Sequence, residues 1–155
     1  MNIFDALERA QIRFPDKDAV MFKGQSTTYG ELYEQACRLS AALSKRFGLL
    51  RADRVAIFLP NIPEFIVSYY AIEKLGAVAV SLNVMLKRNE VEFILRDCGA
   101  RVLIAMPQFL EEVPENISSL EAIVTVGATD RPGCWPFSEL ASELTILELP
   151  SLHTL

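Results

Sequence analysis

Between residues 55 and 126 the sequence alternates largely apolar runs with segments that carry helix signals. The apolar runs, which are typical of strands buried on both faces, occupy residues 55–59, 77–82, 101–105 and 122–126. Helix-start residues or a helical spacing of apolar side chains mark the segments between them, at residues 61–75, 89–98 and 107–113. This alternation predicts an α/β fold with a mostly parallel sheet layered with helices.

The preceding residues predict two helices and a small β-hairpin. Asn2 is suited to cap the first helix, whose apolar residues follow a helical spacing. Strand patterns at residues 19–22 and 26–28 flank a turn at residues 23–25, as a hairpin requires. Thr28 and Glu31 then form a capping-box pattern, which predicts that the second helix begins there.

Two further features define the expected ends of elements. Asn61 is a favoured N-cap residue and Glu64 follows three positions later, so we expect a second capping box after the first buried strand. Beyond residue 126 the sequence favours a loop, one or two helical turns and a last strand, at residues 127–136, 138–144 and 145–149. We assign residues 1–150 to one domain and residues 151–155, which carry no structural signal, to an interrupted linker.

The charge distribution argues against a nucleic-acid-binding protein. The 155 residues include 15 Lys and Arg against 20 Asp and Glu, and the basic residues are scattered. No basic stretch precedes an apolar one at the amino terminus. No apolar run approaches the ~20 residues that span a bilayer. We therefore expect a cytoplasmic protein with no transmembrane segment and no nucleic-acid partner.

The residues alone predict no reaction. His153 is the only histidine, so a Ser–His–Asp arrangement is not expected. Cys37, Cys98 and Cys134 lie far apart without CxxC spacing, so neither a metal site nor a disulfide framework is expected. Neither GxGxxG nor GxxxxGK[ST] occurs. The prediction for this chain is no catalytic residue, no metal ligand and no cofactor of its own.

Several short segments, in order along the chain, resemble motifs of the AMP-forming acyl-CoA synthetases, the adenylate-forming or AMP-binding superfamily. They are residues 14–20 (FPDKDAV), 28–32 (TYGEL), 53–61 (DRVAIFLPN), 63–65 (PEF), 75–83 (LGAVAVSLN) and 90–104 (EVEFILRDCGARVLI). Ala52 stands where the family usually has Gly, and Ser81 where it usually has Pro. The pattern is most similar to fatty-acid–CoA ligases.

The resemblance implies that the chain is the N-terminal subdomain of the large domain of such an enzyme. The parent would use ATP, Mg²⁺ and coenzyme A to convert a carboxylic acid into its acyl-CoA through an acyl-adenylate. The family's phosphate-binding loop, of the form SGTTGxPKG, does not occur among these residues. We therefore expect a fragment truncated before that loop and inactive on its own.

One pair of residues has a role that the resemblance implies. In some related ligases a basic residue just after the LN motif contacts a phosphate of coenzyme A. Met85 stands at that position here, which leaves Lys87 and Arg88 as the candidate phosphate contacts. The alternative interpretation is a solvated helix start.

The sequence leaves two other functions open. One is a self-standing α/β module that binds a small molecule beyond the carboxyl ends of its strands. The other is an interaction or scaffold role for a truncated paralogue. Hydrophobic residues make up 51% of the chain. We therefore expect apolar surface that contacts the remainder of a synthetase, or a second copy in a homodimer.

Overall fold

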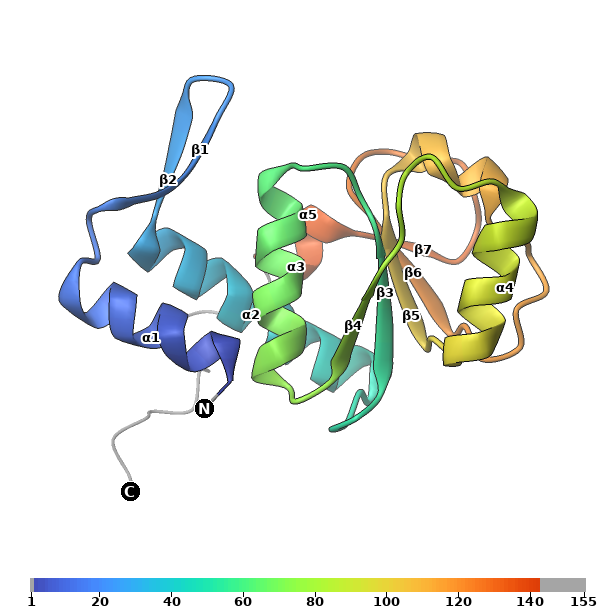
Figure 1. Ribbon diagram of the computed structural model, residues 1–155, viewed down its shortest axis with the longest axis horizontal. Helices are drawn as coiled ribbons and strands as arrows, with labels where there is room; N and C mark the ends of the chain where they lie inside the picture. Colours follow the sequence, from blue (N-terminus) through green and yellow to red (C-terminus); the bar gives the residue numbers. More distant parts are fainter. Residues whose placement is uncertain (1, 143–155) are drawn as a thin grey trace.

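A five-stranded parallel sheet forms the centre of the molecule, and a two-stranded hairpin stands apart from it (Figure 1). The computed structural model describes residues 2–142. The strands of the sheet are β3 (Arg54–Phe58), β4 (Val78–Ser81), β5 (Val102–Ala105), β6 (Ala122–Thr125) and β7 (Cys134–Pro136). Every neighbouring pair in this sheet is parallel. The predicted α/β fold with a parallel sheet is confirmed.

The strand order is β4-β3-β5-β6-β7, so β3 lies between its two successors. The chain passes from β3 to β4 on one side and then returns to place β5 on the other side. The order of the strands therefore changes direction between β3 and β5. In open parallel sheets this position is where ligands commonly bind, beyond the carboxyl ends of the strands.

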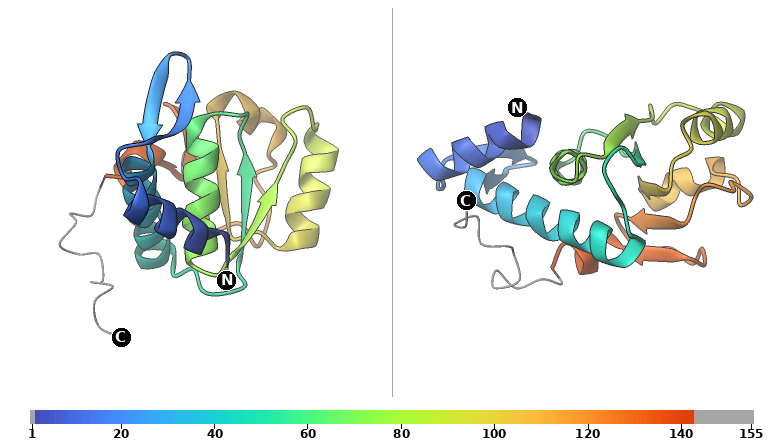
Figure 2. Two further views of the ribbon diagram at one scale, coloured as in Figure 1. Left: turned by 60° about the vertical axis from the view of Figure 1, so that its left-hand side comes forward. Right: turned by 90° about the horizontal axis from the view of Figure 1, so that it is seen from below.

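Helices cover both faces of the sheet, as Figure 2 shows from two directions. One layer contains α2 (Tyr29–Phe47), α3 (Pro63–Lys74) and the short α5 (Phe137–Leu140), and α1 (Ile3–Arg13) packs on the outside of α2 and α3. The other layer contains α4 (Arg88–Cys98) and the 3₁₀ helix η1 (Pro107–Glu112).

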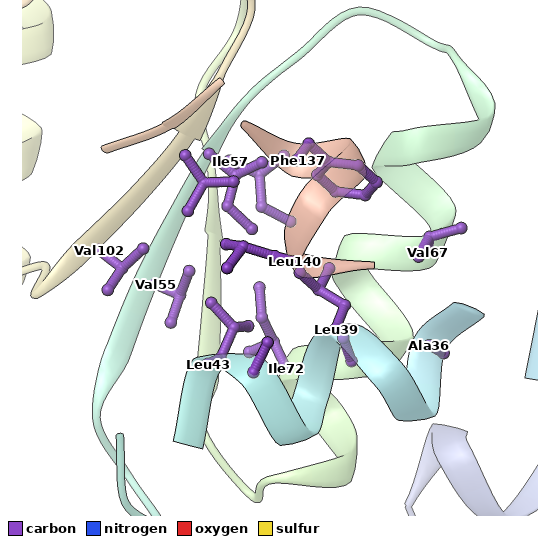
Figure 3. Packing of buried hydrophobic residues seen from close by; sticks show 14 of the residues in the cluster. Ala36, Leu39, Leu43, Val55, Ile57, Val67, Ile72, Val102, Phe137 and Leu140 are labelled. Carbon is purple, nitrogen blue, oxygen red and sulfur yellow. The ribbon is translucent and has the colours of Figure 1, made fainter. Parts of the chain in front are cut away.

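Alternate side chains of the central strands enter two separate apolar cores. Val55 and Ile57 point into the core under α2 and α3, whereas Ala56 and Phe58 point into the core under α4 and η1. All four are fully buried, which is why this strand reads as a continuous apolar run. Figure 3 shows the first core, where side chains from α2, α3, α5 and the sheet meet. Burial of each large aliphatic side chain contributes roughly 1.5–3 kcal/mol.

The first two helices begin at the predicted caps. The Asn2 side chain accepts from the Asp5 amide at 3.1 Å, and Thr28 accepts from the Glu31 amide at 3.2 Å. In each case the carboxylate at the third position accepts from the cap residue's own amide, at 2.8 Å. Asn2 also donates to the carbonyl of Glu73 at 3.2 Å, which ties α1 to the end of α3.

The predicted cap at Asn61 is wrong. The N-cap of α3 is Ile62, and no side chain caps this helix. Pro63 occupies the first helical position, where its fixed φ and missing N–H are well suited. Because the helix starts there, Asn61 falls one residue outside it. The helix expected from about residue 89 begins one residue earlier, at Arg88.

The hairpin pairs β1 (Asp18–Phe22) with β2 (Gln25–Thr28) in antiparallel register, as predicted. The two residues between the strands, Lys23 and Gly24, both have positive φ, 49° and 77°. This is the left-handed pair that a two-residue hairpin turn requires, and its twist matches the strands.

The segment after β6 differs in part from the prediction. Residues 134–136, expected as loop, form the edge strand β7 beside β6. Trp135 of this strand meets Phe47 edge-on, with ring centroids 5.7 Å apart, and the Arg46 guanidinium lies 5.1 Å from its ring. The helical turn expected at residues 138–144 is α5, at residues 137–140. The strand expected at residues 145–149, the linker and His153 lie outside the described residues.

The amino ends of three strands are joined by one arginine. Arg101 donates to Asp53 at 2.6 Å and to Glu121 at 2.7 and 3.3 Å. It also donates to the carbonyls of Phe47 at 3.0 Å and Gly48 at 3.3 Å. The five N–H groups of its guanidinium thereby hold the end of α2 against the starts of β3, β5 and β6.

Candidate functional site

The carboxyl ends of all five parallel strands meet at one edge of the sheet, where the candidate site lies. The residues that follow β3, β4, β5 and β6 form the loops of this edge. Because such loops converge in a parallel sheet, this is the part of the fold best placed to bind a small molecule.

The position between β3 and β5 is filled by protein side chains. Phe58 at the end of β3 stacks on Phe109 of η1, with ring centroids 5.2 Å apart. The Met106 amide donates to the Phe58 carbonyl at 3.4 Å, which brings the start of η1 over the end of β3. Space for a ligand therefore lies to either side of this stack.

One cavity lies between the ends of β3 and β4 and has a volume of about 480 Å³. Its polar lining comes from Asn61, Ser81 and Asn83. The Asn83 side chain is already engaged, because its oxygen accepts from the Met85 amide at 2.9 Å. The cavity therefore offers amide and hydroxyl groups, and its lining residues contribute no charged side chain.

A second cavity, of about 520 Å³, lies beyond the ends of β6 and β7 and includes Glu64, Thr125, Arg131 and Cys134 in its wall. Arg131 donates to carbonyls at the end of η1, those of Leu110 at 2.8 Å and Val113 at 3.0 Å. Burial raises the pKa of the Cys134 thiol, and the charge of Arg131 partly offsets that rise. A thiol kept protonated in this way is a poor nucleophile.

The structure places the sequence-predicted pair, Lys87 and Arg88, at the start of α4 and against η1. The Lys87 ammonium lies 3.7 Å from the Glu112 carboxylate, and 79% of its side chain is exposed. Arg88 donates to the Glu111 carbonyl at 3.0 Å. The Glu90 carboxylate accepts from the Lys87 amide at 2.9 Å. Both residues therefore contact η1, and the carboxylates of Glu112 and Glu90 lie close to Lys87.

Two further groups with displaced pKa values lie away from this edge. Burial, with Cys37 and Glu8 nearby, raises the pKa of Tyr33 between α1 and α2. The hydrogen bond from the Leu50 amide, followed by the Arg101 guanidinium, lowers the pKa of Asp53 at the amino edge. Within residues 2–142 no three His, Cys, Asp or Glu side chains gather as a metal ion requires. Nor is any described helix long and apolar enough to cross a bilayer.

Sequence reasoning missed several residues of this edge. Phe109, Arg131 and Cys134 line or fill the space beyond the strands, yet they lie in segments with no recognisable motif. Only the general rule that ligands bind beyond parallel strands points to the loops that contain them. Asn61, predicted as a cap, instead lines the cavity between β3 and β4.

Comparison with known proteins identifies the fold and the family. The sequence profile of the AMP-binding enzyme family matches residues 7–147. A long-chain-fatty-acid–CoA ligase of Bacillus subtilis is 38% identical over 94 residues, 61% of this chain and 17% of that protein. One of Haemophilus influenzae is 32% identical over 127 residues, 80% of this chain and 23% of that protein.

Two solved structures are similar over most of the chain. The anthranilate CoA ligase AuaEII, in complex with anthranoyl-AMP, gives a TM-score of 0.85 at 33% identity, covering 91% of this chain and 28% of that one. A putative long-chain-fatty-acid CoA ligase of Rhodopseudomonas palustris gives 0.83 at 29% identity, covering 92% and 37%. The chain spans 17–23% of the two curated relatives. On this evidence the chain belongs to the AMP-binding enzyme family and has the fold of the N-terminal region of its acyl- and aryl-CoA ligases.

Proposed function

We propose that this chain is the N-terminal subdomain of an AMP-forming acyl-CoA synthetase. The observation that carries the proposal is the family match over residues 7–147, together with relatives named as CoA ligases. The whole protein would join a carboxylic acid to coenzyme A through an acyl-adenylate, with ATP and Mg²⁺. Residues 1–150 would form the subdomain and residues 151–155 a linker.

The chain's own part in this function is structural. The described residues provide no carboxylate cluster for Mg²⁺, and the full sequence contains no glycine-rich phosphate-binding loop. The residues present therefore do not fit ATP and its metal ion, and no step of the chemistry is assigned to them. We infer that the isolated chain does not form acyl-adenylates.

Lys87 and Arg88 provide a donor set that fits a phosphate of coenzyme A. The Lys87 ammonium is exposed to solvent, and the single hydrogen bond between the Arg88 side chain and the described residues leaves further N–H groups available. We propose that these two side chains contact that phosphate in the whole protein. The nearby glutamates would weaken the contact, so we expect modest affinity.

The open edge of strand β4 is the surface that we expect to contact another part of the protein or a partner. Among residues 2–142 the strand is paired on one side only, and Val78 is 45% exposed. Charged residues are absent from the sequence between Lys74 and Lys87, and uncharged apolar edges favour pairing with another chain. We propose that this edge contacts the rest of the synthetase, or a second copy when the chain is alone.

Pyrophosphate exchange with ATP, Mg²⁺ and a panel of fatty and aromatic acids tests the inactivity of the chain. We expect no exchange above the blank. Exchange that persists after contaminating synthetase has been removed would show that these residues suffice for adenylation.

Binding of coenzyme A and of dephospho-coenzyme A, followed by NMR, tests the phosphate contact. The chain should prefer coenzyme A, and Lys87→Ala should abolish the preference, whereas Lys45→Ala, at an exposed lysine of α2, should leave it unchanged. An equal response of the unmodified chain to both ligands would remove Lys87 and Arg88 from the proposed site.

A self-standing binding module is the second candidate, and the two cavities at the carboxyl edge favour it. Saturable binding of a small molecule to the isolated chain, with shifts confined to Asn61, Ser81 and Asn83 or to Thr125 and Cys134, would support this candidate.

A further inference from the structure

Exposed apolar side chains gather in one stretch of the chain, residues 9–28, which we name the N-terminal flank. It comprises the end of α1, the turn that follows and the hairpin. Ile12 is 68% exposed, Phe14 54% and Met21 78%. Large apolar side chains exposed to this degree are common singly, but a group of them beside charged residues marks an interaction surface.

The same stretch is basic in an acidic protein. Arg9, Arg13, Lys17 and Lys23 stand against two carboxylates, Asp16 and Asp18, which gives residues 9–28 a net charge of +2 in a chain whose total is −5; Glu8 and Glu31 border the stretch. None of the four cations forms an ion pair with any residue among 2–142.

Two of the cations lie over aromatic rings of the flank. The Lys17 ammonium is 5.6 Å from the centre of the Phe14 ring, and that of Lys23 is 5.3 Å from the Phe22 ring. An ammonium group over an aromatic ring keeps the charge and the apolar surface on the same side of the chain. A partner that met the rings would therefore also meet the charges.

An apolar groove adjoins these residues. Its volume is about 260 Å³, and it runs between β1 and the start of α3, with walls that include Val20, Met21, Phe22, Ile62, Pro63 and Ile66. Figures 1 and 2 place α1 and the hairpin at the same end of the molecule, with the hairpin projecting from the body. Ile12, Phe14 and Met21 of the flank are therefore left exposed by the other residues among 2–142, where they can meet an extended surface.

We propose that the N-terminal flank docks on an anionic lipid bilayer. The lysines and arginines would contact lipid phosphates, while Phe14 and Met21 enter the boundary between headgroups and acyl chains. Charge complementarity selects this partner, because the flank opposes the net charge of the chain and combines basic with apolar side chains, as interfacial segments do. The proposal is independent of the proposed synthetase function.

Vesicle co-sedimentation tests the proposal with the full 155-residue chain. We compare vesicles of phosphatidylcholine with vesicles of an equal mixture of phosphatidylcholine and phosphatidylglycerol. We expect binding to the mixed vesicles that falls as salt is added, and far weaker binding to the neutral ones. Lys17→Ser and Lys23→Asn should each weaken binding about fivefold. Asparagine is chosen at residue 23 because it tolerates the positive φ.

Matched variants distinguish binding through this surface from binding caused by charge or apolar exposure in general. Met21→Ser should weaken binding several-fold, whereas Phe93→Ser should leave it unchanged, because Phe93 is 69% exposed but lies on α4, outside the N-terminal flank. Lys45→Ser serves as the charge control. Circular dichroism confirms that each variant is folded.

Three outcomes would overturn the proposal. They are equal binding to neutral and anionic vesicles, an equal loss in the Phe93→Ser control, and no vesicle binding at all. In the last case an acidic protein partner becomes the better explanation of the flank.

Discussion

The guanidinium of Arg101 donates to the carboxylate of Asp53 across 2.6 Å, between residues 48 positions apart in the chain. Asp53 precedes β3 and Arg101 precedes β5, so the pair joins the amino ends of two adjacent strands. The same carboxylate oxygen accepts from the Leu50 amide at 2.7 Å. Asp53 therefore also fixes the turn that leads into the sheet.

The Asp53 contacts predict a loss of stability in acid. The Leu50 amide and Arg101 favour the ionised carboxylate and lower its pKa below the usual value. This contribution is present above the unfolded pKa of about 3.9 and disappears as the pH falls through the folded pKa. The urea midpoint should therefore drop by more between pH 7 and pH 3 in the unmodified chain than in Asp53→Asn. Parallel losses in both proteins would contradict the assignment. The control is Asp97→Asn, at an exposed residue of α4.

Ala52 is expected to be a strained residue that glycine would relieve. Its φ is 69°, in the left-handed region, and its amide donates to the Gly76 carbonyl at 2.9 Å, which holds it there. Left-handed geometry costs a residue with a Cβ about 1 kcal/mol or more. Ala52→Gly should therefore raise the free energy of unfolding by about 1 kcal/mol.

The matched control for Ala52→Gly should change the free energy of unfolding in the opposite direction. Ala6 lies exposed within α1, where Ala6→Gly should lower the free energy of unfolding by about 0.5–1 kcal/mol. Urea denaturation of the three proteins measures both effects. A loss of stability in Ala52→Gly would show that residue 52 does not adopt the left-handed conformation in solution.

Alanine substitution of the two residues predicted as helix caps, Thr28 and Asn61, should lower the stability by different amounts. Thr28→Ala removes the acceptor for the Glu31 amide and should cost about 1 kcal/mol of unfolding free energy. Asn61→Ala removes no cap from α3 and should cost less than about 0.5 kcal/mol. Equal losses in urea melts would mean that Asn61 caps α3 in solution.

The sequence anticipates elements whose signals are local. Thr28 and Glu31 lie three residues apart, so their capping box could be recognised directly. The apolar run of β3 likewise reports burial on both faces. The prediction that Asn61 caps α3 was wrong because Pro63 occupies the first helical position, which makes Ile62 the N-cap. β7 could not be recognised, because three residues that include a proline carry no strand pattern.

Contacts between distant residues explain what else could not be predicted. The five hydrogen bonds of Arg101 reach residues 20 to 54 positions away. At the candidate site, Lys87 and Arg88 are neighbours in sequence, but their partners Glu112 and Glu111 lie in η1, and no pattern links the two segments. The Phe58–Phe109 stack also depends on the crossing of η1 over the sheet.

The centre of β3 should not tolerate a charge. Ile57 is fully buried between β4 and β5, and an unpaired buried carboxylate costs more than the stability of an ordinary domain allows. Ile57→Asp should therefore give no cooperative unfolding transition by circular dichroism. Met85→Asp, at a side chain that is 78% exposed, should fold normally. A soluble and cooperative Ile57→Asp variant would contradict the placement of β3.

Self-association through β4 is expected for the isolated chain. Light scattering over a concentration series should show a rise in mass consistent with a dimer, because this edge is uncharged and, in the part of the chain that the structure describes, paired on one side only. Val78→Lys should shift that rise to higher concentration. Leu50→Lys changes an equally apolar residue that is 69% exposed outside the strand and should have no such effect. A monomer at all concentrations would favour the self-standing module.

Trp135 gives the chain a built-in optical reporter for one edge of its sheet. It is the only tryptophan, 37% exposed, and its ring meets Phe47 and Arg46 at the end of α2. Its emission should therefore respond to any strand added beside β7 and to separation of α2 from the sheet. Pairing at β4 occurs at the opposite edge, four strands away in the order β4-β3-β5-β6-β7. Intrinsic fluorescence can thus distinguish the two edges without a label.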